Sequence, residues 1–304
     1  MSTAAAPPST TTLTPPSNTR PPREAHRLDE ARLGDWIASN LPECAAAKGQ
    51  PATVLQFKGG QSNPTYWVAV NDVPLVLRKK PPGKLLPSAH AIEREYRVMR
   101  ALRDTAVPVP DALALCEDDS VIGTPFFLMR WVPGRIFWDP TVPELGASNT
   151  NRAALYKDYV RVLAALHSVD YAAVGLGDYG KVGGFVTRQV ERWSKQYQAS
   201  RTSDIASMEA LMKWLGDNIP SNDETTLVHG DYRIDNIMFG MDDPPKAIAV
   251  LDWELSTLGH PLSDLAYACM GYHLNLPGRG GLAGVDVRSL GIPTEDEMVA
   301  EYKS

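Results

Sequence analysis

The stretch from Leu227 to Phe239, LVHGDYRIDNIMF, determines how the rest of the chain is interpreted. It places His229, Asp231 and Asn236 in the spacing HxDxxxxN, between two apolar runs that we expect to form strands. A further acidic residue, Asp252, follows at the end of the run AVLDW. If these runs form a hairpin, Asp231, Asn236 and Asp252 converge at one end of a two-stranded ribbon.

That convergence suits phosphoryl transfer. Asp231 would orient an attacking hydroxyl and accept its proton, as a carboxylate does in kinases. Asn236 and Asp252 would offer hard oxygen ligands to Mg²⁺ bridging the phosphates. The competing interpretation is that Asp231 and Asn236 only cap turns.

The composition of the chain limits the kinds of partner that it can bind. The chain has 304 residues, of which 43% are hydrophobic and 22% charged, as in ordinary globular proteins. Its net charge of -6 argues against nucleic acid or an anionic membrane as partner. No apolar run reaches the roughly 18 residues that span a bilayer, so we expect a soluble protein. The three cysteines lack CxxC spacing, so we expect a reducing, cytoplasmic compartment.

The chain divides into a leader and two lobes. Residues 1–24 are mostly Ser, Thr, Pro and Ala, which predicts a disordered leader, with a transit peptide as the alternative. Residues 25–132 predict an N-lobe sheet with helices, and residues 133–304 a mainly helical C-lobe. Strands are expected at 53–58, 65–70, 75–79 and within 124–132, and helices at 28–41, 89–103, 151–169, 187–200, 206–219 and 263–274. The fold class is therefore α+β, with a cleft expected between the lobes.

The end of the chain carries a helix signal. The residues TEDE at 294–297 have the form of a capping box. The helix they open would run for only two turns before Ser304, so we expect that further terminal helices are missing from this chain.

On these motifs the chain resembles the aminoglycoside phosphotransferase-like family, which has a protein-kinase-like bilobal fold and uses HGDxxxxN where protein kinases use HRDxxxxN. It is most similar to the branch whose kinase-like domains are fused to acyl-CoA dehydrogenases in some organisms. The segments that carry this resemblance are GGQSNPTYWV, VLRKKPPGKLLPSAHAIEREYRV, VPGRIFWD, HGDYRIDN and LDWELSTLGHPLSDLAY. Nothing in the chain has the length of a flavin dehydrogenase domain, so we do not expect dehydrogenase activity.

The resemblance implies a role for each motif residue. Asp231 would be the catalytic residue, and Asn236 and Asp252 would hold Mg²⁺. His229 would be a scaffold of the catalytic loop. Asp264 would brace that loop, and it could also cap the helix that it begins.

The same resemblance implies an ATP site in the N-lobe. Arg78 stands where kinases carry Lys, with Lys80 as the alternative cation, and Val76 would contact adenine on the same strand face. Glu95 would pair with Arg78, with Glu93 as the competing choice.

Two further segments would contact the nucleotide. In the turn GGQSNP, Ser62 and Asn63 could donate to phosphate oxygens, although an ordinary hairpin turn would look similar. In FFLMRWVPG, the expected hinge, Met129 would lie behind adenine. The backbone of Arg130 and of Val132 would bind the base.

The sequence thus predicts an ATP- and Mg²⁺-dependent O-phosphotransferase acting on a hydroxyl of a small molecule. A basic stripe of Arg188, Arg192 and Lys195 and the resembled branch point to a hydroxyacyl-CoA or a hydroxy acid, although a solvated helix face explains the stripe equally well. The alternative is a catalytically silent nucleotide-binding module, which would be signalled by Arg78 and by Trp253 and Glu254 after Asp252. A protein kinase is disfavoured because no APE-type segment follows Asp252. The acceptor, the choice of ATP or GTP and the oligomeric state stay open.

Overall fold

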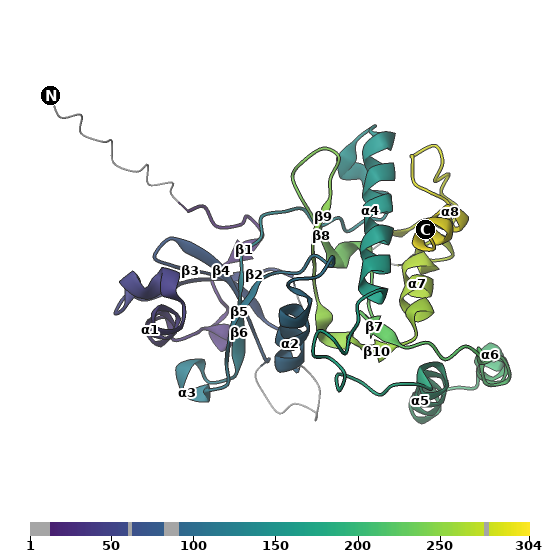
Figure 1. The fold of residues 1–304 in the computed structure, drawn as a ribbon, viewed down its shortest axis with the longest axis horizontal. Coiled ribbons are helices and arrows are strands. Elements are labelled where there is room, and N and C mark those ends of the chain that lie inside the picture. Colours follow the sequence, from purple (N-terminus) through teal and green to yellow (C-terminus); the bar gives the residue numbers. More distant parts are fainter. Residues whose placement is uncertain (1–12, 60–62, 82–90, 277–279) are drawn as a thin grey trace. The chain divides into compact units, whose positions relative to one another are not determined.

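The computed structural model describes residues 13–59, 63–81, 91–276 and 280–304 (Figure 1). The chain forms two compact units. Unit 1 comprises Met1–Tyr96 and Asp111–Trp131, and unit 2 comprises Arg97–Pro110 and Val132–Ser304. The lobe boundary expected at residue 132 lies next to the end of unit 1, but the segment from Arg97 to Pro110 belongs to unit 2.

Unit 1 is built on a six-stranded antiparallel sheet in the order β1-β2-β3-β4-β6-β5. Its strands are β1 (Thr19–Arg20), β2 (Thr53–Phe57), β3 (Thr65–Val70), β4 (Val73–Lys79), β5 (Ala112–Cys116) and β6 (Phe126–Arg130), and its helices are α1 (Glu30–Asn40), α2 (Ile92–Leu102) and α3 (Asp119–Ile122). Leu33 and Ile37 of α1 are fully buried against the apolar side chains of one sheet face. The alternation of β4 then leaves Val76 and Arg78 for the other face.

The prediction of a disordered leader over residues 1–24 is wrong for its second half. Thr19 and Arg20 form β1, which pairs with Phe57 and Gln56 of β2. The pairing satisfies backbone groups that a bare sheet edge would expose, and this gives a Ser- and Pro-rich segment a reason to order. Residues 1–12 lie outside the described residues.

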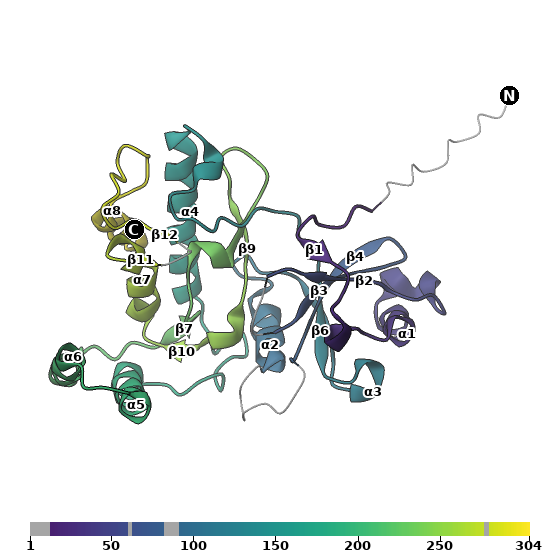
Figure 2. The same cartoon turned by 180° about the vertical axis from the view of Figure 1, so that it is seen from behind.

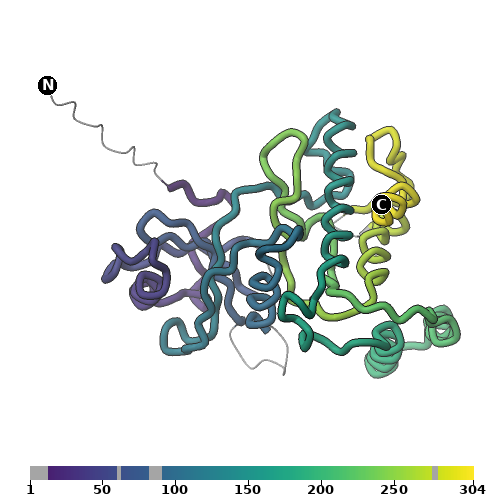
Figure 3. Tube along the Cα trace, viewed as in Figure 1, coloured from purple at the N-terminus to yellow at the C-terminus, as the bar shows by residue number. Residues whose placement is uncertain are grey.

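Unit 2 is mainly helical. Its elements are α4 (Asn149–His167), α5 (Phe185–Ser200), α6 (Ala206–Asp217), β7 (Thr226–Val228), β8 (Ile237–Phe239), β9 (Ala247–Val250), β10 (Thr257–Gly259), α7 (Pro261–Cys269), β11 (Asn275–Leu276), β12 (Gly280–Gly281) and α8 (Glu295–Tyr302). The long helix α4 packs beside α7, α8, β7 and β9 (Figure 2). The chain leaves α4 for α5 and α6 and returns to the strand pairs β7–β10 and β8–β9 (Figure 3).

Helix ends follow the local chemistry. The predicted capping box is present at α8, where the Thr294 hydroxyl accepts from the Glu297 N–H and the Glu297 carboxylate accepts from the Thr294 N–H. The helix expected at 263–274 is shorter than predicted, because α7 ends at Cys269 and a tighter turn follows. Among the described residues, no helix combines the length and the apolar character that crossing a bilayer requires.

Candidate active site

The HGDxxxxN motif forms a loop between β7 and β8. Gly230 has φ +83°, and a Cβ at this position would lie 2.7 Å from the Leu255 carbonyl oxygen. Only glycine accepts both the left-handed backbone and the close approach. The sequence HGD therefore fixes how the chain turns into Asp231.

Asp231 is held by its neighbours in the motif. Its Oδ2 accepts a hydrogen bond from Asn236 Nδ2 at 3.0 Å, and its backbone carbonyl accepts from the same nitrogen at 2.9 Å. Its Oδ1 lies 3.0 Å from Arg233 Nε. Burial and a hydrogen bond with Asp231 raise the pKa of Tyr267 to about 12, so this phenol stays protonated and donates to the carboxylate. Three side chains thus orient the predicted catalytic residue.

The side chain of Asn236 is oriented by Asp231. Because its amide nitrogen donates twice to Asp231, Oδ1 is the atom left to act as a ligand, and no hydrogen bond to Oδ1 is found in the described part of the chain. The Leu251 N–H donates to the Asn236 carbonyl oxygen at 2.8 Å, which ties the loop to the residue before Asp252. Asp252 has φ +64°, a conformation that Asp tolerates better than most residues.

The surrounding charge also fits a cation. The pKa of Asp235 is raised, mainly by burial, and the charges of Asp231 and Asp252 raise it further, against the lowering effect of Arg233. Asp231 and Asp252 therefore both lie close enough to Asp235 for their charges to act on it. An amide oxygen and carboxylates are the donors that Mg²⁺ prefers, so the residues present fit this ion.

His229 and Asp264 build the support beneath the loop. His229 is fully buried, its Nε2 lies 2.8 Å from the Leu251 carbonyl oxygen, and its Nδ1 accepts from the Asp231 N–H at 3.2 Å. Both ring nitrogens are engaged, as a scaffold role requires. The two carboxylate oxygens of Asp264 accept from the N–H groups of His229 and Gly230 at 2.6 and 2.8 Å.

Asp264 does not cap its own helix, so the second role expected for it is wrong. The cap of α7 is His260, whose side chain accepts from the Leu262 N–H. Asp264 lies in the first turn of α7, but both of its oxygens are turned to the catalytic loop.

Unit 1 carries the residues expected at the nucleotide. Arg78 Nε lies 2.8 Å from Glu95 Oε2, and the side chains are 12% and 2% exposed. Asn63 Nδ2 donates to Glu95 Oε1 at 2.9 Å. The other candidates, Lys80 and Glu93, pair with each other on a more exposed part of the surface. The geometry thus favours Arg78 and Glu95 over these alternatives.

The structure gives fewer contacts for the other residues that were predicted to bind the nucleotide. Met129 pairs directly with Val76 across β4 and β6, so the two share the face of Arg78. The Arg130 N–H donates to the Asp111 carbonyl oxygen at 2.9 Å, so this N–H is engaged within unit 1. Val132 is the first residue of unit 2 after β6. Ser62 lies outside the described residues.

A small aromatic cavity of about 90 Å³ borders the catalytic loop within unit 2. Its walls include Trp138, Tyr232, Tyr267 and Tyr272, with Arg233 and Asp235 as charged members. Neither Arg233 nor Tyr267 was among the residues predicted for the site. Arg233 could have been noticed two residues after Asp231, whereas only the packing of α7 brings Tyr267 to the loop.

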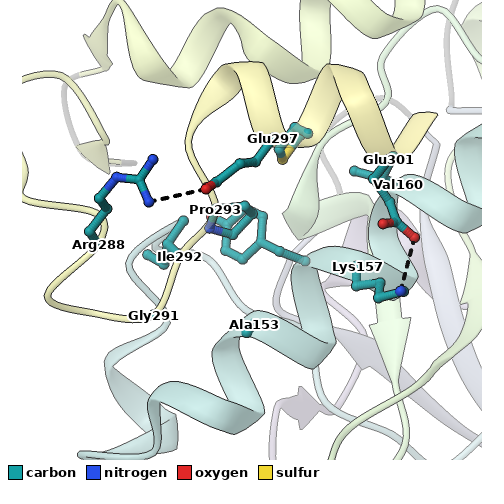
Figure 4. Close-up of a pocket in the computed structure, with 11 residues that line it drawn as sticks. Ala153, Lys157, Val160, Arg288, Gly291, Ile292, Pro293, Glu297 and Glu301 are labelled. Carbon is teal, nitrogen blue, oxygen red and sulfur yellow. Dashed lines mark ion pairs between the residues drawn. The ribbon is translucent and has the colours of Figure 1, made fainter. Parts of the chain in front are cut away.

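A larger cavity of about 340 Å³ lies between α4 and α8 (Figure 4). Ion pairs between Lys157 and Glu301 and between Arg288 and Glu297 border it. None of the predicted site residues lines this cavity. Size alone therefore does not mark the active site.

The basic stripe of α5 gives no support to an anion site. The Arg188 guanidinium donates to the carbonyl oxygens of Gly183 and Lys181, which fixes the start of the helix. The Arg192 guanidinium lies 5.6 Å from the centre of the Trp193 ring. None of the three stripe residues lines either cavity.

Comparison with known proteins assigns most of the chain to a family. Residues 53–298 match the sequence model described as "Phosphotransferase enzyme family". Acyl-CoA dehydrogenase family member 10 of Mus musculus is 49% identical over 289 residues, which cover 94% of this chain and 26% of that protein. The chain thus spans about a quarter of the length of this curated relative.

Solved structures agree as well. The crystal structure of a candidate aminoglycoside phosphotransferase from Ralstonia eutropha JMP134 has a TM-score of 0.80 and 48% identity, over 91% of this chain and 80% of that one. A ternary complex of the phosphotransferase APH(2″)-IIa with streptomycin and ATP has a TM-score of 0.54 and 15% identity, over 83% of this chain and 77% of that one. The second likeness is one of fold alone.

Proposed function

The chain belongs to the phosphotransferase enzyme family matched by residues 53–298, and from this membership we propose that it is an ATP- and Mg²⁺-dependent O-phosphotransferase acting on a hydroxyl group of a small molecule. The predicted family and the predicted α+β, protein-kinase-like fold are both confirmed by these matches. The observation that carries the proposed activity is the fixed pair of Asp231 and Asn236, joined by hydrogen bonds of 3.0 and 2.9 Å.

In this proposal Asp231 binds the acceptor hydroxyl and takes its proton. Hydrogen bonds from Asn236 and Tyr267 and the ion pair with Arg233 hold the carboxylate in one orientation, so little reorganisation precedes the transfer. Asn236 Oδ1 and the Asp252 carboxylate would hold Mg²⁺, which when bound neutralises charge on the transferring phosphate.

On the unit 1 side we assign ATP binding to the face of β4 that carries Val76 and Arg78. Arg78 keeps a permanent cation and can donate to two phosphate oxygens at once. Glu95 orients it, and Asn63 joins the same carboxylate to the turn that would cover the phosphates. The structure of APH(2″)-IIa, which shares this fold, is a ternary complex with streptomycin and ATP, and this supports the choice of donor.

For the acceptor we favour a hydroxyacyl-CoA or a hydroxy acid. The cavity beside the catalytic loop is lined by aromatic and apolar residues, with Arg233 and Asp235 as its charged members. Such walls suit an apolar chain or ring that carries one hydroxyl, whereas a polycationic aminoglycoside needs more carboxylates. The proposed substrate is thus a small molecule. We place the protein in a reducing, cytoplasmic compartment, because its three cysteines are buried and free.

A catalytically silent nucleotide-binding module is the second candidate, because Arg stands at position 78 where kinases carry Lys. The pair of Arg78 and Glu95 argues against it, since the ion pair that kinases require is retained with Arg.

The test is Mg²⁺-dependent consumption of ATP across hydroxyacyl-CoAs, hydroxy acids, amino alcohols and aminoglycosides. Asp231→Asn is the control, because it keeps the shape of the side chain and removes the base. We expect at least one acceptor to raise turnover of the wild type by a factor of about 10² or more over the variant. If the wild type binds ATP but no acceptor raises turnover above that of Asp231→Asn, the silent module is the better description.

A further inference from the structure

Lys79 is a buried cation without a counter-charge. It is 5% exposed, and its Nζ donates one long hydrogen bond of 3.4 Å, to the Lys80 carbonyl oxygen. Burial lowers the pKa of Lys79, and no carboxylate of the described residues pairs with it. Residues 1–12, 60–62, 82–90 and 277–279 contain no Asp or Glu at all. Because an unpaired buried charge costs stability, this position suits an anion.

The strand register shows which residues lie on the same face of the sheet as Lys79. Arg20 pairs with Gln56, Gln56 with Tyr66, and Tyr66 with Leu77. Opposite residues of antiparallel strands point to one face, and every second residue along a strand returns to it. Lys79, two residues after Leu77, therefore lies on the same face as Arg20.

The turn Glu24–His26 lies over this face. The Tyr66 hydroxyl donates to the His26 carbonyl oxygen at 3.0 Å, and the Arg23 N–H donates to Gln56 Oε1 at 3.4 Å. These two bonds, with the pairing of β1, fix the turn above the end of the sheet where Lys79 is buried.

Cations gather under the turn, and two of them carry a buried nitrogen that has no hydrogen-bond partner among the described residues. Arg20 Nε and His26 Nδ1 are buried atoms with no hydrogen-bond partner in the described structure. The pKa of His26 is lowered by burial and by the charges of Lys79, Arg23 and Arg20, with no carboxylate acting on it. The charged neighbours on the same turn, Glu24 and Arg27, are exposed.

We propose that this face of unit 1 binds a small phosphate-bearing anion between Arg20, His26 and Lys79. A phosphate group has oxygens enough to accept from Arg20 Nε, from a protonated His26 Nδ1 and from the Lys79 ammonium. The site lies on the sheet face opposite to Arg78 and Glu95, so it is separate from the proposed nucleotide contacts. It does not rest on the proposed phosphotransferase activity.

The test is an NMR titration of the histidine rings of the full chain in inorganic phosphate, against sodium chloride at equal ionic strength. The His26 signals are assigned with the variant His26→Gln. Because an anion beside the ring favours the charged imidazolium, phosphate should raise the pKa of His26 saturably.

Lys79→Met should weaken this response about tenfold or more, since a charged partner is lost. Without phosphate it should also raise the pKa of His26, because one repelling charge is removed. The matched control is Arg27→Met, which removes an exposed cation from the same turn and should change neither result. Arg20→Gln gives an independent answer if Lys79→Met does not fold.

The proposal is overturned if the wild type titrates identically in phosphate and in chloride. It is also overturned if the rise persists undiminished in Lys79→Met and Arg20→Gln, because phosphate would then act only through general screening.

Discussion

Replacing Asp264 by Asn tests how the catalytic loop is held. Both oxygens of this carboxylate, which is 1% exposed, accept backbone hydrogen bonds from the loop, at 2.6 and 2.8 Å. Asn keeps one acceptor and turns an N–H donor toward a backbone N–H. Hydrogen bonds to a charged group contribute roughly 1.5–3 kcal/mol each, so we expect a loss of about 3 kcal/mol in the free energy of unfolding.

The matched control is Asp170→Asn. The Asp170 carboxylate also accepts two backbone N–H bonds, from Ala172 and Ala173 at 3.1 and 3.0 Å, but it is exposed. Water can replace what this variant loses, so its cost should stay below about 1 kcal/mol. Urea unfolding followed by tryptophan fluorescence compares the two variants. Equal losses in Asp264→Asn and Asp170→Asn would refute the reasoning, because burial would then add nothing to the bonds.

Three further changes have defined outcomes. In thermal unfolding, Gly230→Ala should cost more stability than Gly175→Ala. Both glycines have a positive φ, but only a Cβ at position 230 would meet backbone atoms. Equal costs would refute the close approach of Gly230 to the Leu255 carbonyl oxygen. Arg78→Met should destabilise unit 1 by about 3 kcal/mol, because it leaves the Glu95 charge buried, and it should raise KM for ATP. Arg78→Lys should restore much of the stability and of the KM. If Arg78→Met changes neither quantity, the ion pair of Arg78 and Glu95 does not have this role. Hydrogen bonds from the backbone and side chain of Thr294 lower the pKa of Glu297 below its usual 4.5, so the charged Glu297 stabilises the fold above pH 4.5 and this stabilisation is lost as the pH falls through the lowered pKa. Glu297→Gln should therefore flatten this part of a plot of unfolding free energy against pH. An unchanged plot would contradict the capping box.

The local parts of the site could be predicted from the sequence. HGDxxxxN is a single loop, so its spacing already specifies that Asn236 can reach back to Asp231. The pairing of Arg78 with Glu95 was implied by the resemblance to kinases, which pair a cation on this strand with a Glu on the following helix. In both cases the partners are close in sequence or fixed by regular geometry.

The contacts that local pattern does not show join distant parts of the chain. The contact of Asp264 with the loop, across 35 residues, was expected only from the family resemblance. The contact of Tyr267 with Asp231, made from the same helix, was not predicted. The strand β1 depends on a partner edge in β2, and nothing in the composition of residues 1–24 indicates that edge. Tertiary packing decides these contacts, and local pattern does not encode it.

The left-handed backbone of Asp252 bears on how variants at this position can be interpreted. With φ +64°, the residue occupies a region that Asn also accepts, whereas Ala resists it. Asp252→Ala would therefore mix a conformational penalty with the loss of a charge. Asp252→Asn changes the charge alone, and only that substitution can measure what the carboxylate itself contributes.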